Sequence, residues 1–400
     1  MNVKEVESAA ARLKYIVHHT PINSSRTFSE MSGAELFVKC ENLQKTGSFK
    51  VRGAYNKLAK LSEGGELTSV VSSSAGNHAQ GVAYAATALQ ISAFIVMPRS
   101  TPIAKVAATG GYGAKVILHG DCYDDAYQKA VEIQQETGVV FVHPFDDADV
   151  IAGQGTVALE IFKDLPTVDA VLIPAGGGGL LAGMAFYIKQ INPRVKVIGV
   201  QAQGANAIVR SFQEKAHCST ESSVTIADGI SVKVPGKMTI ELINRYVDEM
   251  VTVTDEEIAE AILLLLERTK MLVEPAGAVS LAAAIHKKTD LKGKRVVSVL
   301  SGGNIDVSFI HKIVEKGLLT RGRQLKFGTV MLDIPGSLQY FSSIVAGCGA
   351  NIIMVQYDRL HADLRLNEAI LHIVCEVSGT KHGQDVIRQL EQNGYKVFLE

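Results

Sequence analysis

The chain has 400 residues, of which 47% are hydrophobic and 20% are charged, and its formal net charge is -1 at pH 7. At roughly 150 residues per domain, this length suggests two or three domains with substantial cores. The balanced charge argues against nucleic-acid or membrane partners, and five cysteines without metal-ligand spacing indicate a reduced chain. Because the amino-terminal residues are polar and no apolar run is long enough to span a bilayer, we expect a cytoplasmic protein.

The first elements in chain order lead to a lysine. Residues 3–16 are predicted to form an amphipathic helix and residues 36–40 a strand. Lys50 then follows a short turn and begins a segment whose apolar residues recur at helical spacing. In the first turn of a helix, the dipole helps to keep an amine neutral and nucleophilic, so that it can form a Schiff base with an aldehyde cofactor. Most lysines are solvated surface charges, so Lys50 by itself is a weak signal.

Strands and helices alternate over the next 250 residues or so. The predicted strands are 69–72, 93–97, 115–118, 139–142, 170–173, 195–200 and 296–300. The predicted helices are 79–89, 104–109, 123–137, 157–162 (after the turn Gly153-Gln-Gly155-Thr), 180–190, 255–269 and 275–286. This alternation is typical of a mostly parallel sheet with helices on both faces, and it suggests two α/β lobes with a cleft between them. Ligands of such sheets bind at the carboxyl ends of the strands.

Four consecutive glycines, Gly176, Gly177, Gly178 and Gly179, stand between a buried strand and a helix. Their N–H groups can converge on an anion without interference from Cβ atoms, and the helix dipole adds to the attraction. A dinucleotide site does not fit, because the G-x-G-x-x-G register is missing and Gln201 stands where a ribose-binding acid is expected. A Walker A site fails too, since no Gly-Lys-Ser/Thr follows. A plain tight turn, the structural alternative, would need only one or two glycines.

A second strand-to-helix turn consists of Ser74, Ala75, Gly76, Asn77 and His78. Its backbone donors suit a substrate carboxylate. The alternative for Asn77 is that it caps the following helix. Capping is also an adequate explanation for Glu274, which precedes Pro275 at a favourable first helical position.

From about residue 320 the pattern changes. Residues 321–324 read as a polar linker. They are followed by a strand at 327–333, a helix at 336–348, strands at 351–357 and 366–378, a helix at 384–392 and a strand at 395–399. The order βαββαβ is ferredoxin-like.

Together with the segment Ser301-Gly-Gly-Asn304, these motifs resemble the fold type II pyridoxal-phosphate enzymes, and within them the threonine dehydratases (threonine ammonia-lyases). The resemblance runs from about residue 14 to 316. It implies a two-lobed, tryptophan synthase β-like catalytic domain over residues 1–320, with a small lobe at about 45–150, and pyridoxal 5'-phosphate as cofactor. Residues 325–400 resemble an ACT regulatory domain.

The resemblance also implies roles for individual residues. Lys50 would carry the cofactor and act as the base, with Phe49 packed nearby. Asn77 would bond the ring hydroxyl oxygen, and Ser301 the pyridine nitrogen, where a neutral partner favours β-elimination over transamination. The phosphate would be held by Gly176, Gly177, Gly178, Gly179 and Leu180, and the substrate carboxylate by Ser74, Ala75, Gly76, Asn77 and His78. His78 is expected to be structural rather than an acid or base.

Two departures separate this chain from the related serine racemases. Ala75 stands where they carry a serine that exchanges protons on the second face, so elimination is expected over racemisation. Gln201, Ala205 and Ala207 replace their acidic metal ligands, so no carboxylate metal site is expected, although a monovalent ion or a water is left open.

The expected function is dehydration and deamination of L-threonine to 2-oxobutyrate and ammonia, and of L-serine to pyruvate. The alternatives are a serine racemase, a β-replacement synthase, or a non-catalytic amino-acid sensor. An amino-acid effector, in the family usually isoleucine or valine, is expected around Asp333, Pro335, Gly336 and Asn351. A nucleotide effector is left open, as is a biosynthetic or catabolic role, and we expect a homodimer or homotetramer.

Overall fold

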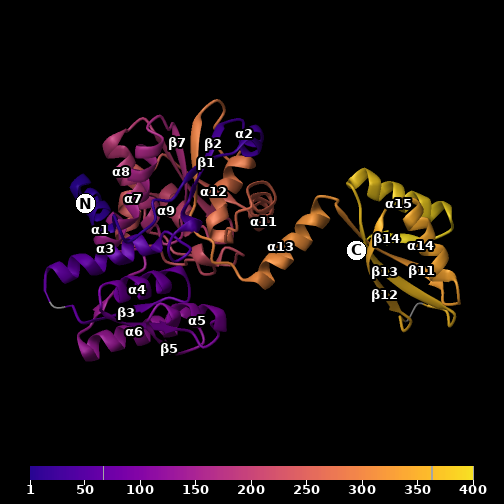
Figure 1. Ribbon diagram of the computed structural model, residues 1–400, viewed down its shortest axis with the longest axis horizontal. Coiled ribbons are helices and arrows are strands. Elements are labelled where there is room, and N and C mark those ends of the chain that lie inside the picture. Colours follow the sequence, from indigo (N-terminus) through magenta and orange to yellow (C-terminus); the bar gives the residue numbers. More distant parts are fainter. Residues whose placement is uncertain (66, 362–363, 400) are drawn as a thin grey trace. The chain divides into compact units, whose positions relative to one another are not determined.

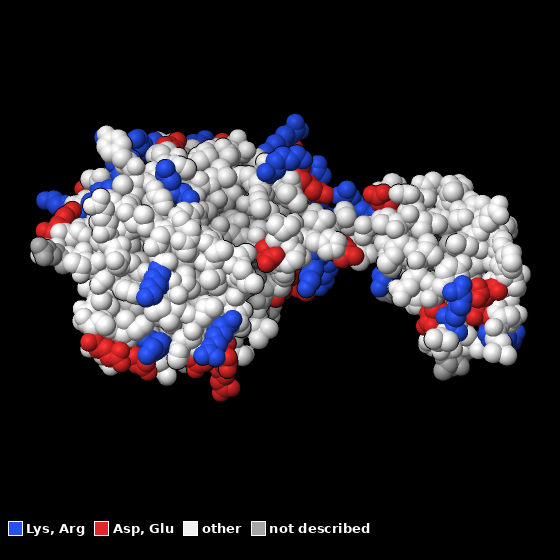
Figure 2. All heavy atoms as spheres, turned by 60° about the horizontal axis from the view of Figure 1, so that its bottom comes forward, with Lys and Arg blue, Asp and Glu red and all other residues white. Residues whose placement is uncertain are grey.

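The computed structural model describes residues 1–65, 67–361 and 364–399, and the chain divides into two compact units, Met1–Ile305 and Asp306–Glu400 (Figure 1). Within the described ranges, none of the helices combines the length and the apolar character that a membrane span requires. On the face that Figure 2 presents, acidic and basic side chains are scattered in small groups of both signs.

A six-stranded sheet forms the centre of the first unit, with the strand order β1-β2-β10-β7-β8-β9. Only β1 is antiparallel to its neighbour. The strands are β1 (Ile22–Ser24), β2 (Glu35–Cys40), β7 (Ala170–Pro174), β8 (Lys196–Ala202), β9 (Glu249–Val253) and β10 (Arg295–Leu300). The central strands are buried along nearly their whole length, as expected for parallel strands covered on both faces.

A second, smaller sheet of the first unit is entirely parallel, with the order β5-β4-β3-β6. Its strands are β3 (Ser69–Ser73), β4 (Ser92–Met97), β5 (Lys115–Leu118) and β6 (Val140–Phe141). Figure 1 shows it beside α4, α5 and α6. The two sheets agree with the expected two α/β lobes.

The helices of the first unit occupy most of the predicted positions. They are α1 (Val3–Leu13), α2 (Arg26–Ser32), α3 (Lys50–Glu63), α4 (Asn77–Ala88), α5 (Ile103–Gly111), α6 (Tyr123–Thr137), α7 (Ala148–Asp164), α8 (Gly179–Ile191), α9 (Ala207–Glu214), α10 (Lys237–Tyr246), α11 (Asp255–Leu264) and α12 (Pro275–Ile285). Shorter turns are η1 (Glu41–Leu43), η2 (Asp228–Ile230) and a π turn, η3 (Leu265–Thr269). The sequence analysis did not predict β1, α2, α9, α10 or β9.

The start of α7 corrects one expectation. The predicted turn at residues 153–156 lies inside this helix, which begins at Ala148 after the capping residue Asp147. A Cβ atom on Gly153 would lie 2.6 Å from the carbonyl oxygen of Arg52, and one on Gly155 would lie 3.0 Å from that of Gly183. These glycines therefore allow α7 to pack closely against α3 and α8, and they do not mark a loop.

The second unit begins with a helix that the sequence analysis missed, α13 (Val307–Thr320). It continues with β11 (Gln324–Leu332), α14 (Ser337–Gly347), β12 (Asn351–Asp358), β13 (Glu368–Glu376), α15 (Thr380–Gln392) and β14 (Val397–Leu399). The strands pair antiparallel in the order β12-β13-β11-β14. Both the βαββαβ order and this arrangement are ferredoxin-like, as predicted.

Candidate active site

Lys50 is the first residue of α3, and its side chain is half-buried. Its Nζ donates a hydrogen bond to the carbonyl oxygen of Pro144 (3.0 Å) and lies 5.4 Å from the centre of the Phe49 ring. Burial lowers the pKa of Lys50 to about 8, although the nearby Glu274 opposes this shift. Because the positive end of the helix dipole also disfavours the charged amine, part of it is neutral and nucleophilic near pH 7.

The turn before the lysine pairs with the segment that follows β10. Ser48 and Gly302 form an antiparallel bridge, and the Phe49 N–H donates to the carbonyl oxygen of Ser301 (3.2 Å). The Ser301 side chain is buried. Two motifs about 250 residues apart in the sequence are thus joined by backbone hydrogen bonds.

The glycine loop lies next to the same lysine. It connects β7 to α8, and a Cβ atom on Gly177 would collide with the ring of Phe145. Phe145 follows Pro144, whose carbonyl oxygen accepts from the amine of Lys50. The lysine and the glycine loop therefore both contact one dipeptide, Pro144-Phe145, for which the sequence carried no recognisable signal.

The shape of the glycine loop is held by its neighbours. Gly178 has a φ of +99°, which favours glycine, and the hydroxyl of Thr239 donates to the carbonyl oxygen of Gly177 (2.8 Å). The side chain of Leu180 belongs to the main hydrophobic core. At Leu180, therefore, only the backbone N–H can face an anion.

The turn from Ser74 to Gly76 leads from β3 into α4, which begins at Asn77. Asn77 does not cap this helix, because the capping position is Gly76. Instead its Nδ2 donates to Oε1 of Glu274 (2.6 Å) and its Oδ1 accepts from Nδ2 of Asn304 (2.8 Å). The turn itself is half-buried, and Ala75 contributes only a methyl group to it.

The His78 ring is buried and contacts the backbone of the neighbouring strand segment. Its Nε2 lies 3.1 Å from the carbonyl oxygen of Val142, and burial lowers the pKa of His78 to about 3. The ring is therefore neutral at physiological pH, with Nε2 as the donor. This environment fits a structural role.

Glu274 shows that the capping interpretation was wrong. It occupies the capping position of α12 and Pro275 the first helical position, but the carboxyl group makes no capping hydrogen bond and contacts Asn77 instead. Burial raises the pKa of Glu274 to about 8, and the negative charge of Asp228 adds to this shift. Near pH 7 the group is largely an uncharged carboxylic acid.

Some buried polar atoms of the two candidate turns have no hydrogen-bond partner among the described residues. They are Oγ1 of Thr46 and Oγ of Ser48, just before Lys50, and Oγ of Ser73 and Nδ1 of His78, at the two ends of the second turn. Leaving such atoms unsatisfied is costly, so their presence in both turns is compatible with a site that binds a polar ligand.

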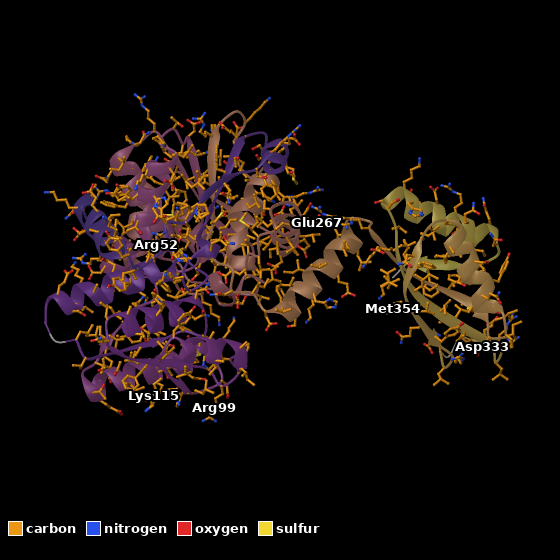
Figure 3. The ribbon with its side chains drawn as sticks, viewed as in Figure 1. Arg52, Arg99, Lys115, Glu267, Asp333 and Met354 are labelled. Atoms are coloured by element: carbon orange, nitrogen blue, oxygen red, sulfur yellow. The ribbon has the colours of Figure 1, made fainter. Side chains whose placement is uncertain are left out.

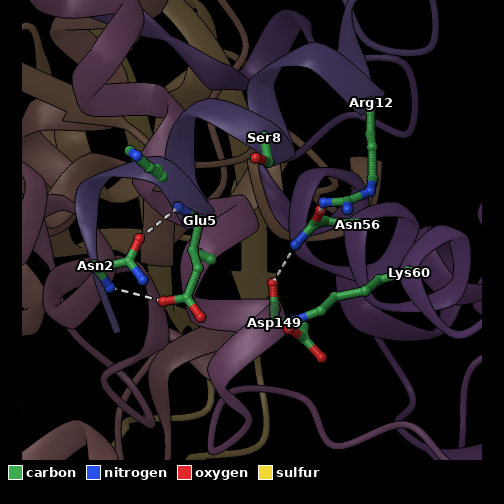
Figure 4. Close-up of a pocket in the computed structure, with 9 residues that line it drawn as sticks. Asn2, Glu5, Ser8, Arg12, Asn56, Lys60 and Asp149 are labelled. Atoms are coloured by element: carbon green, nitrogen blue, oxygen red, sulfur yellow. Dashed lines mark hydrogen bonds and ion pairs between the residues drawn. The ribbon is translucent and has the colours of Figure 1, made fainter.

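A separate hollow of about 280 Å³ lies on the surface of the first unit, between α1, α3 and α7 (Figure 4). It is lined by Asn2, Lys4, Glu5, Ser8, Arg12, Asn56, Lys60, Asp149 and Ala152. Arg12 is paired with Glu63, and Lys60 with Asp149 (2.5 Å). Because these charges are already matched and Lys50 is not part of the lining, this hollow is a poor candidate for the reaction.

The four candidate effector residues lie in the second unit. Asp333 is bound by Arg359 (2.6 and 3.2 Å), and Figure 3 shows its place in this unit. Gly336, next to Pro335, has a φ of +92° and precedes α14. Asn351 comes after the end of this helix, whose 11 residues span roughly 16 Å. The candidates therefore mark the two ends of α14.

Comparison with known proteins identifies the family of the chain. The family described as pyridoxal-phosphate dependent enzymes matches residues 13–302. The L-threonine ammonia-lyase of Thermotoga maritima is 48% identical over 399 residues, which are 100% of this chain and 99% of that protein.

Two solved structures show the same fold over most of the chain. The processed form of threonine deaminase isoform 2 from Solanum lycopersicum is 35% identical with a TM-score of 0.74, and the match covers 80% of this chain and 90% of that one. Maize serine racemase is also 35% identical with a TM-score of 0.74, over 80% and 98% of the two chains. Since the family match spans well over half of the sequence, the chain belongs to the pyridoxal-phosphate dependent enzymes.

Proposed function

We propose that this pyridoxal-phosphate dependent lyase converts L-threonine to 2-oxobutyrate and ammonia, by losing the β-hydroxyl group as water and then hydrolysing the enamine, and that it converts L-serine to pyruvate and ammonia in the same way. The observation that carries the proposal is the placement of Lys50. Its half-buried amine, with a pKa of about 8, contacts the Pro144-Phe145 dipeptide on which the glycine loop packs. The identity with an L-threonine ammonia-lyase over the whole chain supports the choice of substrate.

The residues of the site fit pyridoxal 5'-phosphate. Backbone N–H groups of Gly176–Leu180 at the start of α8 would hold the phosphate, and a Cβ at Gly177 is excluded by Phe145. The Ser301 hydroxyl would face the pyridine nitrogen, and Asn77 the ring hydroxyl oxygen. When bound, the cofactor supplies an electron-withdrawing ring that acidifies the Cα proton of an attached amino acid.

The remaining steps belong to residues of the chain. Backbone N–H groups of the Ser74–His78 turn bind the substrate carboxylate, and Nζ of Lys50 accepts the Cα proton. The β-hydroxyl group leaves as water, and the enamine product takes up water to give 2-oxobutyrate and ammonia. Ala75 offers no hydroxyl group that could return a proton to the other face, so elimination is favoured over racemisation.

A catalytic domain is proposed over residues 1–320, with a small lobe at about 45–150, and residues 325–400, which follow α13 in the second unit, are proposed to be an ACT regulatory domain. The ferredoxin-like order of its strands supports this assignment. An amino acid such as isoleucine or valine, or a nucleotide, would act as effector, with Asp333, Pro335, Gly336 and Asn351 as candidate contacts. A homodimer or homotetramer and a cytoplasmic location, expected from the sequence, complete the proposal.

Three other functions give different products. Serine racemisation is suggested by the similarity to the maize enzyme, but Ala75 argues against it. A β-replacement synthase would consume L-serine and sulfide. An amino-acid sensor would bind isoleucine tightly without deaminating threonine, and the retained Lys50 and glycine loop argue against that role.

The test measures 2-oxobutyrate formation from L-threonine, repeated with isoleucine, valine and AMP. We expect Lys50→Ala to reduce the rate by roughly 10²–10⁴-fold or more, and Lys292→Ala, at an exposed position, to leave it unchanged. Chiral analysis of the products from L-serine, with and without sulfide, separates lyase, racemase and synthase. A Lys50→Ala protein with full turnover would refute the proposal.

A further inference from the structure

Three polar side chains connect the lysine turn to the start of α4. Nδ2 of Asn304 donates to the carbonyl oxygen of Thr46 (2.8 Å) and to Oδ1 of Asn77 (2.8 Å). On its other side, Nδ2 of Asn77 donates to Oε1 of Glu274 (2.6 Å). An amide nitrogen carries two hydrogens, so Asn304 has used both, whereas Asn77 keeps one.

We propose that Asn304 and Glu274 are positioning residues that hold the amide of Asn77 in one orientation, with its remaining Nδ2 hydrogen available to the cofactor. The inference rests on the proposed cofactor site and adds two residues to it. From the sequence, Glu274 was interpreted as a helix-capping residue, and Asn304 appeared only as the last residue of a motif. These residues act through Asn77 and are not themselves expected to touch the reacting atoms.

The chemistry of the contacts selects one orientation of the amide. Asn304 presents only N–H groups to Asn77, and a rotation of the Asn77 amide by 180° would set its NH₂ group against them. The reversed orientation is therefore disfavoured by Asn304, because two NH₂ groups would meet. In the observed orientation Glu274 accepts from the Nδ2 of Asn77, which adds to the preference.

Glycines in the neighbouring backbone leave room for the side chains of Glu274 and Asn304. A Cβ atom on Gly302 would collide with Oε1 of Glu274, and one on Gly47 would collide with the side chain of Asn304. Gly47 also has a φ of +72°, in the region that favours glycine. Two glycines in the paired segments at Ser48 and Gly302 thus admit the two side chains that hold Asn77.

The protonation state of Glu274 suits its proposed role as a hydrogen-bond acceptor for Asn77. Burial and the charge of Asp228 raise its pKa to about 8, against the opposing effects of Asn77, Lys105 and Lys50. The uncharged carboxyl group offers a carbonyl oxygen to Asn77, and a glutamine side chain offers the same acceptor at the same length. The substitution Glu274→Gln is therefore the conservative test, and Glu274→Ala removes the acceptor.

The experiment measures the dissociation constant of pyridoxal 5'-phosphate from the full-length apoenzyme by absorbance titration, together with the thermal unfolding of each apoenzyme. We expect Asn304→Ala and Glu274→Ala to weaken cofactor binding roughly tenfold, the equivalent of one lost hydrogen bond. Glu274→Gln should stay within about twofold of the wild type. The control Asn393→Ala changes an exposed asparagine of the second unit and should leave the affinity unchanged.

A double-mutant cycle separates positioning from general loss of structure. If Asn304 acts through Asn77, the double variant Asn77→Ala/Asn304→Ala will bind the cofactor no more weakly than Asn77→Ala alone. Additive losses, or wild-type affinity in Asn304→Ala, would overturn the proposal. Wild-type protein that binds the cofactor without deaminating threonine would refute the proposed function, and the cycle would still test the positioning of Asn77.

Discussion

A buried network of four charges supports the helix that carries Lys50. Its members are Lys39 of β2, Glu41 of η1, Arg52 of α3 and Glu160 of α7, which are between 0% and 8% exposed. Arg52 donates to both Glu41 oxygens (2.8 Å each) and to both Glu160 oxygens (2.7 and 2.9 Å), and Lys39 donates to Glu160 (2.6 Å). Figure 3 shows Arg52 within the first unit. The two positive and two negative charges cancel.

We predict that Glu160→Gln destabilises the first unit by about 3–5 kcal/mol, because it leaves Lys39 and Arg52 against Glu41 alone in a dry environment. Burial by itself disfavours the charged guanidinium, but Glu41 and Glu160 raise the pKa of Arg52 above its ordinary value. After the substitution the arginine still stays charged, because Glu41 remains bound to it and a guanidinium group is not deprotonated in proteins. For a unit of this size the loss corresponds to a melting temperature lower by roughly 5–8 °C.

The assay is thermal unfolding of the apoenzyme followed by circular dichroism. Glu30→Gln is the control, because Glu30 pairs with Arg26 at 2.8 Å on an exposed helix surface, where solvent screening leaves such a pair with little effect on stability. Adding Lys39→Met to Glu160→Gln restores neutrality and should recover at least about half of the loss. A Glu160→Gln protein that melts within about 2 °C of the wild type would refute the reasoning.

Three further predictions concern the site. Gly177→Ala places a methyl group against the Phe145 ring, so we expect cofactor binding, measured by titration, to weaken at least roughly tenfold. The control Gly110→Ala has open space around the added methyl group and should bind the cofactor like the wild type. Equal cofactor affinities of Gly177→Ala and the wild type would contradict the assignment of the loop. With the pKa of Lys50 at about 8, the rate of pyridoxal 5'-phosphate capture by the apoenzyme, measured by stopped-flow absorbance, should rise roughly tenfold from about pH 7 to 9. The rate should then level off, because nearly all of the amine is neutral above its pKa. A rate that continues to rise steeply, as for an ordinary lysine, would rule out the lowered pKa. Ala75→Ser adds a hydroxyl group to the turn and should raise the ratio of D-serine to pyruvate formed from L-serine several-fold by chiral chromatography, whereas an unchanged ratio would count against the role given to this position.

Local patterns were sufficient for much of the architecture. The strand at 115–118 and the helix at 123–137 were predicted with the bounds that β5 and α6 have. Both depend on side chains that repeat at the period of one element, so neighbouring residues carry the information. The glycine loop and the lysine turn were recognisable for the same reason, since each is a contiguous run whose backbone chemistry is local.

Predictions from the sequence were wrong or missing where the local signal was weak or had two interpretations. Gly153 and Gly155 of α7 suggested a turn, whereas they are glycines because α3 and α8 approach this helix closely. The short segments β1, α2 and β9 owe their positions to the sheet and core that they join.

By itself, therefore, the sequence determined most of the alternating strands and helices, and it singled out Lys50 as the candidate amine and the glycine loop as the candidate anion-binding segment. Only the tertiary structure decided that Asn77 is held between Glu274 and Asn304, which lie 197 and 227 residues further along the chain. It also decided that Lys50 and the glycine loop both contact the dipeptide Pro144-Phe145. The physical reason is that periodicity and turn chemistry act between near neighbours, whereas hydrogen bonds and burial depend on which distant segments the packing brings together.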